Sequence, residues 1–183
     1  MQRPTENLSF KKIRVKTQLG TFVLMFNEKG LSAVRFPRRC NRRTPARCDV
    51  AHLVGVKWLR VNDRLDLSHC TLFERKVYAA LMKVPAGKTV TYGELAKRAG
   101  FPGAARAVGS ALKKNRLPLI IPCHRVVPAS VPIPINFYEA EIGAVQTTIL
   151  GKNGKVWTGG LGQYSAGVLW KRALLEYERH RGA

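Results

Sequence analysis

The chain has 183 residues, 45% of them hydrophobic and 23% charged, so it can bury enough apolar surface to fold, which excludes disorder throughout. Its 32 Lys and Arg against 11 Asp and Glu leave a formal net charge of +21, which predicts a polyanionic partner; nucleic acid is favoured over an anionic membrane because no basic amphipathic helix with a wide apolar face stands out. The N-terminal residues lack the apolar stretch of a secretory signal, so we expect an intracellular protein, nuclear in a eukaryote and otherwise cytoplasmic.

The first 36 residues contain the strands of an N-terminal lobe. From Ile13 to Phe36 apolar residues alternate or run together between turn signals, which predicts a hairpin or short meander. The stretch "PRRCNRRTPAR" follows, and we interpret it as a solvated loop, with a dedicated DNA patch as the alternative. Val50 to Val61 can form a helix, and Asn62 to Ser68 connects to a second lobe.

Four cysteines are too few and too scattered to predict a disulfide framework. A zinc site is conceivable from a set of Cys and His residues, but their spacing lacks the tight CxxC pairs typical of zinc sites. We therefore interpret them as ordinary thiols and surface histidines, and expect no metal. The set is Cys40, Cys48, His52 and either His69 or Cys70.

From Phe73 onward the apolar period becomes helical. The first helix ends before Pro85-Ala86-Gly87, and "TVTYGELAKRAG" predicts a short strand leading into a second helix that Gly100 stops. A third helix runs from Ala104 to about Lys114. Two helices joined by a short turn containing Gly predict a helix-turn-helix unit. The apolar stripe of the first helix is Phe73, Val77, Leu81 and Val84.

The third helix is rich in small residues. Such residues permit close approach to another surface, either in a tightly packed core or in a DNA groove. The long cation Arg106 and the terminal Lys113 and Lys114 favour the groove, because the minor groove is only about 6 Å wide and bulky side chains would exclude a helix. The small residues are Ala104, Ala105, Ala107, Gly109, Ser110 and Ala111.

The segment after residue 127 predicts a hairpin and then a terminal helix. "ILGKNGKVW" places Asn153-Gly154 in a tight turn between two short strands. "GVLWKRALLEYERHRG" is amphipathic, with Leu169, Ala173 and Leu174 facing the core.

The stretch "IIPCHRVV" sets Cys123 beside His124. A thiol with an ordinary pKa of about 8.5 is a poor nucleophile at neutral pH, so a base must take its proton. Consecutive residues in a regular element point to different faces, so a direct contact needs a turn, which Pro122 and Pro128 make plausible, or a bridging water. From these residues alone, a buried inert cysteine with a nearby surface histidine is the favoured interpretation.

Longer motifs change that interpretation. "PCHRV", together with "TYGELAKRAG", "ARAVGSALKKN", "LPLIIP" and "YSAGVLWKRALLEYE", resembles the O6-alkylguanine-DNA alkyltransferases, also called methylated-DNA protein-cysteine methyltransferases. The similarity runs from about Phe73 to Glu178, interrupted once, and "LGTFVLMFNEKGLSAVRF" is similar to the N-terminal strands of that family.

The resemblance implies a two-lobed fold. Residues 1–68 would form an α/β lobe with its linker, and residues 69–183 a mainly helical lobe with a winged-helix-like helix-turn-helix. It also implies direct-reversal DNA repair by a monomer that binds the minor groove of double-stranded DNA. Such a protein moves an alkyl group from O6-alkylguanine, and also from O4-alkylthymine, to its own cysteine, irreversibly, stoichiometrically and without a cofactor.

The resemblance further implies a role for each matching residue of the reaction site. Cys123 would accept the alkyl group, His124 would deprotonate it through water, and Glu178 would orient the imidazole. Asn115 would join the helix-turn-helix to the acceptor segment. Tyr92 would crowd the phosphate to promote base flipping and donate its hydroxyl to the leaving purine.

Further matching residues would contact DNA or the flipped base. Arg106 would fill the hole left in the base stack, on a helix face that includes Ala105 and Gly109. The backbones of Cys123, Val126 and Ser165 would read the guanine edge, and Tyr164 would form a pocket wall.

Other interpretations remain open. Tyr92 could pack between helices, Asn115 could cap a helix C-terminus, and Glu178 could pair with Arg181 on a solvated face. Their joint register with Cys123 favours the functional roles. A non-catalytic lesion-binding protein of the same fold is the main rival; a cysteine hydrolase fits the charge of +21 poorly.

Two departures from the family pattern concern the pocket. The family usually has a short loop where Pro128 to Gln163 stand here, so we expect an insertion at about residues 131–160. Ala166 occupies a position where glycine is common, which would narrow the pocket against bulky adducts.

Overall fold

The computed structural model describes residues 11–17, 20–37, 64–131, 136–137, 147–150, 156–159, 161–162 and 164–181. The predicted helix at 50–61 and the possible ligands Cys40, Cys48 and His52 lie outside these ranges, as does nearly all of the arginine-rich stretch. Within them, no helix combines the length and apolar character needed to span a membrane.

The N-terminal part is a three-stranded antiparallel meander, as predicted. Its strands β1 (Lys11–Thr17), β2 (Gly20–Asn27) and β3 (Gly30–Arg35) pair in the order β1-β2-β3, with a bulge between Met25 and Phe26. Alternation of apolar residues gives the sheet one buried face, on which Phe22, Leu24 and Val34 lie.

The start of β3 is held by the segment that leads to the helices. Leu31 N–H donates to the Arg64 carbonyl at 2.8 Å, and Asp66 N–H donates to the Leu31 carbonyl at 2.9 Å. Gly30, with φ of +126°, turns the chain so close to this segment that a Cβ would lie 1.8 Å from the Arg64 oxygen. Only glycine fits there.

Three helices follow, as predicted. They are α2 (Leu72–Met82), α3 (Tyr92–Arg98) and α4 (Ala105–Lys113). Thr71 with Glu74, and Thr91 with Glu94, form capping boxes that fix the starts of α2 and α3. After α3, Gly100 adopts φ of +85° and ends the helix, which leaves residues 99–104 to connect α3 to α4.

A short parallel bridge brings the start of α3 beside the Cys-His segment. Strand β4 (Val90–Thr91) pairs with β5 (Val126–Val127), which directly follows the 3-10 turn η1 (Cys123–Arg125). Tyr92 is the first residue after β4. The bridge therefore sets the position of Tyr92 relative to Cys123.

The C-terminal segment contains three short strands and the last helix. Strands β6 (Asn136–Phe137), β7 (Thr147–Leu150) and β8 (Val156–Gly159) form an antiparallel sheet, and α5 (Val168–Arg181) follows. The β7–β8 pair confirms the predicted hairpin; the predicted turn residues lie outside the described ranges. On α5, Leu174 is buried and Ala173 half-buried, while the side chain of Leu169 is outside the description.

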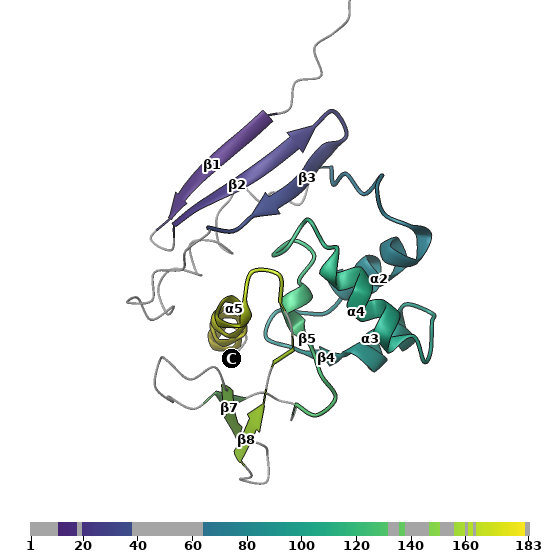
Figure 1. Cartoon of the computed structure of the whole chain (residues 1–183), viewed down its shortest axis with the longest axis vertical. Helices are drawn as coiled ribbons and strands as arrows, with labels where there is room; N and C mark the ends of the chain where they lie inside the picture. Colours follow the sequence, from purple (N-terminus) through teal and green to yellow (C-terminus); the bar gives the residue numbers. More distant parts are fainter. Residues whose placement is uncertain are drawn as a thin grey trace, which may run out of the picture.

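The segment between Val131 and Leu161 starts and ends at one small apolar cluster. Val131, at its start, and Leu161, at its end, are both buried together with Val127 and Leu175. In Figure 1 the β7–β8 pair lies at the end of the molecule away from the N-terminal sheet. Both ends of this segment are thus fixed in the core.

The N-terminal sheet packs directly on the C-terminal part. Val34 N–H donates to the Arg116 carbonyl at 2.7 Å, and Phe22 contacts Trp170 of α5 with ring centroids 5.6 Å apart. Figure 1 shows the sheet lying across α5, with α2, α3 and α4 grouped to one side. The N-terminal sheet therefore contacts both α5 and the loop that leads to Cys123.

Replacement of Gly30 by alanine should lower the free energy of unfolding more than replacement of Gly100. Both glycines have positive φ, so both variants carry the backbone cost of about 1–2 kcal/mol. Only at position 30 would the new Cβ meet a carbonyl oxygen; nothing lies within 4 Å of a Cβ at position 100. We expect an additional loss of about 2 kcal/mol for Gly30→Ala in urea unfolding. Equal losses would show that the Arg64 contact does not constrain β3.

Candidate active site

Cys123 lies in a tight turn, as the flanking prolines predicted. Pro122 has φ of −79° and ψ of 63°, the geometry of an inverse γ-turn, and Cys123 N–H donates across it to the Ile121 carbonyl at 2.7 Å. The 3-10 turn η1 then carries the chain from Cys123 to Arg125. This irregular backbone lets adjacent residues be placed independently of strand or helix geometry.

Asn115 braces this turn from the end of α4. Its Nδ2 donates to the Ile121 carbonyl at 2.9 Å and to Cys123 Sγ at 3.2 Å. Its Oδ1 accepts from Leu117 N–H at 2.9 Å. Asn115 is buried, and its side chain bonds to the loop that carries Cys123 and not to the last turn of α4. It therefore links the helix pair to the cysteine.

The loop between Asn115 and Cys123 contains a strained residue. Leu119 has φ of +78°, which is unfavourable for a residue with a Cβ. Such conformations persist only where the surroundings fix them, and here the half-buried Leu119 side chain packs on the Phe22–Trp170 cluster. Packing from the N-terminal sheet thus helps to fix the loop between Asn115 and Cys123.

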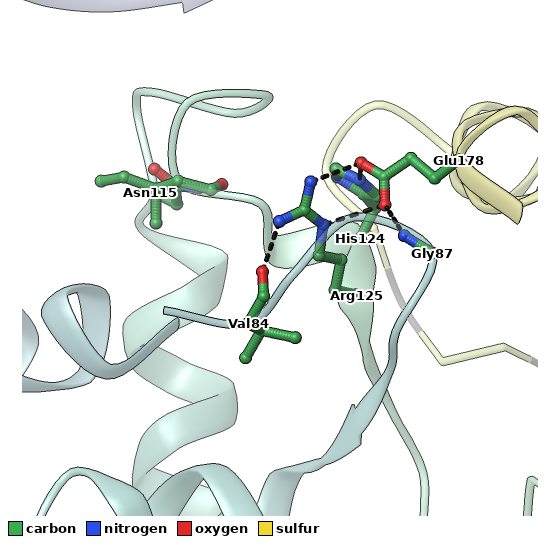
Figure 2. Close-up of polar contacts among 7 residues, drawn as sticks. Val84, Gly87, Asn115, His124, Arg125 and Glu178 are labelled. Carbon is green, nitrogen blue, oxygen red and sulfur yellow. Dashed lines mark hydrogen bonds and ion pairs between the residues drawn. The ribbon is translucent and has the colours of Figure 1, made fainter. Parts of the chain in front are cut away.

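Behind the cysteine, His124 and Glu178 form a buried pair. His124 Nε2 and Glu178 Oε1 are 2.9 Å apart, and both residues are almost fully buried. Glu178 also accepts from Arg125 Nη2 at 2.7 Å, from Arg125 Nε at 2.9 Å and from Gly87 N–H at 3.2 Å (Figure 2). Arg125 Nη1 donates to the Val84 carbonyl at 2.5 Å. Glu178 therefore does not lie on a solvated face.

The protonation of this pair follows from its surroundings. Burial raises the pKa of Glu178, but the bonds from His124 and Arg125 outweigh it and hold the pKa at about 2. Burial lowers the pKa of His124, and Glu178 only partly opposes the effect. The carboxylate can only accept, so the neutral imidazole must carry its proton on Nε2.

The second nitrogen of His124 is left as a proton acceptor. Nδ1 is buried and makes no hydrogen bond with any residue that the structure describes. Burial raises the pKa of the Cys123 thiol, and Asn115 and Lys171 oppose it only in part. Before reaction Cys123 is therefore a protonated thiol, and the adjacent His124 has an Nδ1, unbonded among the described residues, that can accept a proton.

Lys171 is part of this site although the sequence analysis did not select it. Its side chain is buried, and Nζ donates to the Val126 carbonyl at 2.6 Å and to the Leu161 carbonyl at 2.7 Å. Burial lowers its pKa to about 8. The available signal was its position on α5, where it shares the buried face with Leu174 and Glu178 at helical spacing.

Tyr92 lies between α4 and Gly162. A Cβ added at Gly109 would meet its ring at 3.8 Å, and a Cβ at Gly162 would lie 3.3 Å from its hydroxyl. Burial raises the pKa of Tyr92 and Cys123 raises it further, so the hydroxyl stays a donor. Gly162 has φ of +84°, so both its backbone and its missing Cβ suit this position.

Tyr164 lies close to Cys123 and begins a turn that continues through Ser165 and Ala166. Gly167 N–H donates to the Tyr164 carbonyl at 2.8 Å, which places Ser165 and Ala166 at the two centres of the turn. The Tyr164 hydroxyl is buried and has no well-formed hydrogen bond with the described residues. Burial raises the pKa of Tyr164 well above its ordinary value, with a further contribution from nearby Cys123.

The cationic residues of α4 lie away from the sulfur. Arg106 is exposed, and its guanidinium makes no hydrogen bond within the described part of the chain. Lys113 and Lys114 are exposed as well, and Ala105 is half-buried. The opposite face of α4 packs in the core through Val108, Ala111 and Leu112.

A cysteine with a neutral histidine and a buried glutamate behind it, joined by an asparagine to a cationic helix pair, defines a thiol-nucleophile protein built on a candidate nucleic-acid-binding unit. Residues 72–154 match the family model described as the 6-O-methylguanine DNA methyltransferase DNA-binding domain. The chain belongs to the O6-alkylguanine-DNA alkyltransferase family, as its motifs implied.

Individual relatives agree with this placement. The methylated-DNA–protein-cysteine methyltransferase of Mycobacterium leprae is 49% identical over 67 residues, which are 36% of this chain and 41% of that one. Its counterpart from Mycobacterium bovis is 39% identical over 111 residues, 61% of this chain and 50% of that one. The chain thus matches about half the length of these relatives or less.

Solved structures match over more of the chain. The Mycobacterium tuberculosis O6-methylguanine methyltransferase superposes with a TM-score of 0.61 at 29% identity, covering 94% of each chain. A structure of the M. tuberculosis protein OGT in complex with DNA gives a TM-score of 0.60 at 30% identity, covering 92% of each chain. The likeness therefore includes the N-terminal sheet as well as the helices.

Glu178 should make stability depend on acidity. Its pKa is held at about 2 in the folded protein, below the ordinary 4.5, so its contribution is complete above about pH 4.5 and is lost as the pH falls towards 2. We expect the wild type to lose up to about 3 kcal/mol over this range through Glu178. Glu178→Gln should be less stable at neutral pH and lack this part of the decline.

The measurement is urea unfolding at a series of pH values. Asp66, whose pKa is also lowered to about 2, titrates in the same range, so the difference between wild type and variant isolates Glu178. Glu176→Gln, which removes a carboxylate of the same helix bonded to Arg172, is the matched control and should keep the wild-type profile. Parallel curves for Glu178→Gln and wild type would contradict an ionised buried Glu178.

Proposed function

We propose that this chain repairs DNA by moving an alkyl group, methyl foremost, from O6 of guanine to the sulfur of Cys123. The surroundings of that sulfur are the observation that best supports this proposal. The Asn115 amide bonds to the sulfur at 3.2 Å, and Nδ1 of the neighbouring neutral His124 makes no hydrogen bond with the described residues. Family membership supports the same reaction. A cysteine hydrolase would instead form a thioester that water then cleaves. The thioether proposed here is not cleaved by water.

The reaction uses the groups around Cys123 in order. His124 takes the thiol proton at Nδ1, directly or through water, and ionised Glu178 stabilises the imidazolium that forms. The thiolate attacks the saturated carbon, the S–C bond forms, and the C–O6 bond breaks with its electron pair going to guanine. Tyr92 donates its proton to the purine, and the proton held by the His124 imidazolium returns to the Tyr92 oxygen through solvent, so the products are guanine and a thioether.

These residues cannot convert the thioether back to the free thiol of Cys123. A thioether lies outside the reversible oxidation chemistry of cysteine, and nothing among the proposed groups removes the alkyl group. Each molecule therefore acts once, and the chemistry requires no cofactor.

DNA must present the base outside the helix. An O6 substituent cannot reach a buried sulfur while guanine stays stacked, so the nucleotide is flipped at a cost of a few kcal/mol. In this proposal residues 69–183 form a winged-helix-like lobe that binds the minor groove of double-stranded DNA as a monomer. Helix α4 enters the groove through Ala105 and Gly109, and Arg106 fills the vacated position. Residues 1–68 form the supporting lobe.

The flipped guanine would be read by backbone groups. The carbonyls of Cys123 and Val126 and the N–H of Ser165 face its edge, and Tyr164 forms a wall. Lys171 supports this assignment, because its bond to the Val126 carbonyl at 2.6 Å fixes one of these groups.

Labelled DNA tests the reaction directly. Duplex DNA carrying O6-[³H-methyl]guanine should transfer about one label per chain to Cys123, located by peptide mass spectrometry. Cys123→Ala should take up none, whereas Cys70→Ala, the matched control at another buried cysteine, should behave as wild type. Tight binding of the lesion without label would favour the non-catalytic lesion-binding alternative. Multiple turnovers would contradict a single-use acceptor.

Arg106→Ala should impair flipping more than binding. Phosphate contacts from many other cations supply most of the nonspecific affinity, so the dissociation constant for duplex DNA should change little. The transfer rate from duplex DNA should fall about tenfold, a fraction of the free energy of flipping. Single-turnover rates on duplex and single-stranded substrates measure this, with Lys113→Ala as the control. Equal losses of rate and affinity would contradict insertion of Arg106.

A further inference from the structure

An aromatic cluster connects the N-terminal sheet to the Cys123 site. Phe36, directly after β3, has its ring centroid 5.2 Å from that of Phe22, 5.0 Å from that of Trp170 and 6.2 Å from that of Tyr164. The last pair is perpendicular, with an interplanar angle of 90°, an arrangement that aromatic edges and faces favour. Phe36 is thus a ring by which the sheet contacts Tyr164, beside the cluster of Phe22, Trp170 and Leu174 on which Tyr164 also packs.

Packing contributes to the position of the Tyr164 ring, which lies against both core clusters. Its hydroxyl has no well-formed hydrogen bond with any residue in the described ranges, although it is buried close to Cys123. Its backbone is fixed by the turn that Gly167 closes, which leaves the side-chain torsions to be decided by neighbours. Phe36 is the aromatic neighbour on the side of the N-terminal sheet.

Phe36 itself has little freedom to move. Phe22 and Trp170, the rings behind it, are buried and contact each other at 5.6 Å. Two residues before Phe36, Val34 N–H donates to the Arg116 carbonyl in the loop that follows Asn115. The sheet is therefore hydrogen-bonded to the loop that leads to Cys123. This bond limits how far Phe36 can move relative to the sulfur.

We propose that Phe36 is a specificity-determining residue, which sets how far the Tyr164 ring stands from Cys123 and hence the size of alkyl group that the sulfur accepts. The proposal rests on the proposed function, in which Tyr164 is a wall of the alkyl pocket. Phe36 touches no reacting atom and acts through Tyr164. A smaller side chain at position 36 lets the ring withdraw, and a larger one presses it towards the sulfur.

Two substitutions of opposite size test this. Duplex DNA with a single O6-methylguanine or O6-benzylguanine in the same sequence gives the ratio of benzyl to methyl transfer rates. Phe36→Leu should raise this ratio about threefold or more, and Phe36→Trp should lower it by a similar factor, because pockets discriminate substituents of different size by such factors. Near-ultraviolet circular dichroism checks that each variant is folded.

Phe26 supplies the matched control. It is a half-buried phenylalanine of the same sheet that packs on the larger core cluster and has no ring contact with Tyr164. Phe26→Leu and Phe26→Trp should leave the ratio within about twofold of wild type even if both rates change. If Phe36→Leu does not fold, Phe36→Met takes its place, since it keeps most of the volume without a rigid ring, and should also raise the ratio.

The outcomes separate the two proposals. A ratio unchanged in the folded Phe36 variants, or changed equally in the Phe26 variants, overturns the assignment of Phe36. Absence of transfer to wild-type Cys123 from both adducts overturns the proposed function instead. A ratio that moves in opposite directions for Leu and Trp supports Phe36 as the determinant.

Discussion

The buried carboxylate of Glu178 is the interaction on which the rest of the site depends. It accepts hydrogen bonds from His124 and Arg125 of the η1 turn and from Gly87 in the connection between α2 and β4. An ionised carboxylate without water is costly unless every acceptor position is used, so α5 can dock only where these donors converge. The same bonds choose the tautomer of His124. One group thereby fixes both the placement of the last helix and the chemistry of the base.

A second constraint acts from the opposite side of the cysteine. Asn115 uses both its amide protons on the acceptor turn, and Leu119 is kept at positive φ by the packing of its side chain on the Phe22–Trp170 cluster. Neither a helix nor a strand supplies this geometry. The loop from Asn115 to Cys123 is instead shaped by contacts with α4, the N-terminal sheet and α5 together.

Much of the fold could be predicted from the sequence, because local patterns encode it. The alternation from Ile13 to Phe36 gave the meander, and the helical stripe, the "TYGELAKRAG" motif and the prolines beside Cys123 gave α2, α3 and the irregular turn. The placement of Asn115 and Glu178 near Cys123 came from family motifs. No local pattern puts residues 54 positions apart within hydrogen-bonding distance, as His124 and Glu178 are.

Features that depend on tertiary packing were out of reach. Lys171 has helical spacing with the buried Leu174 and Glu178, but a charged side chain is expected to face solvent, and its two carbonyl acceptors belong to other segments that only the fold brings close. Phe36 resembles any apolar residue at the end of a strand, and its contact with Tyr164 joins positions far apart in the chain. Gly162 resembles any loop glycine in the sequence, and only the structure shows that its positive φ and the nearby Tyr92 hydroxyl and Pro128 ring favour a residue without a side chain.

The small cluster that holds both ends of the segment between Val131 and Leu161 has a practical consequence. Val131 and Leu161 are buried against Val127 and Leu175, so the chain leaves and returns through two fixed points. Lengthening a loop between fixed ends costs only about 0.6 kcal/mol for each doubling. The segment between Val131 and Leu161 is therefore a suitable position for an engineered insert. A peptide tag or a small folded reporter could replace it while the turn at Cys123 keeps its contacts.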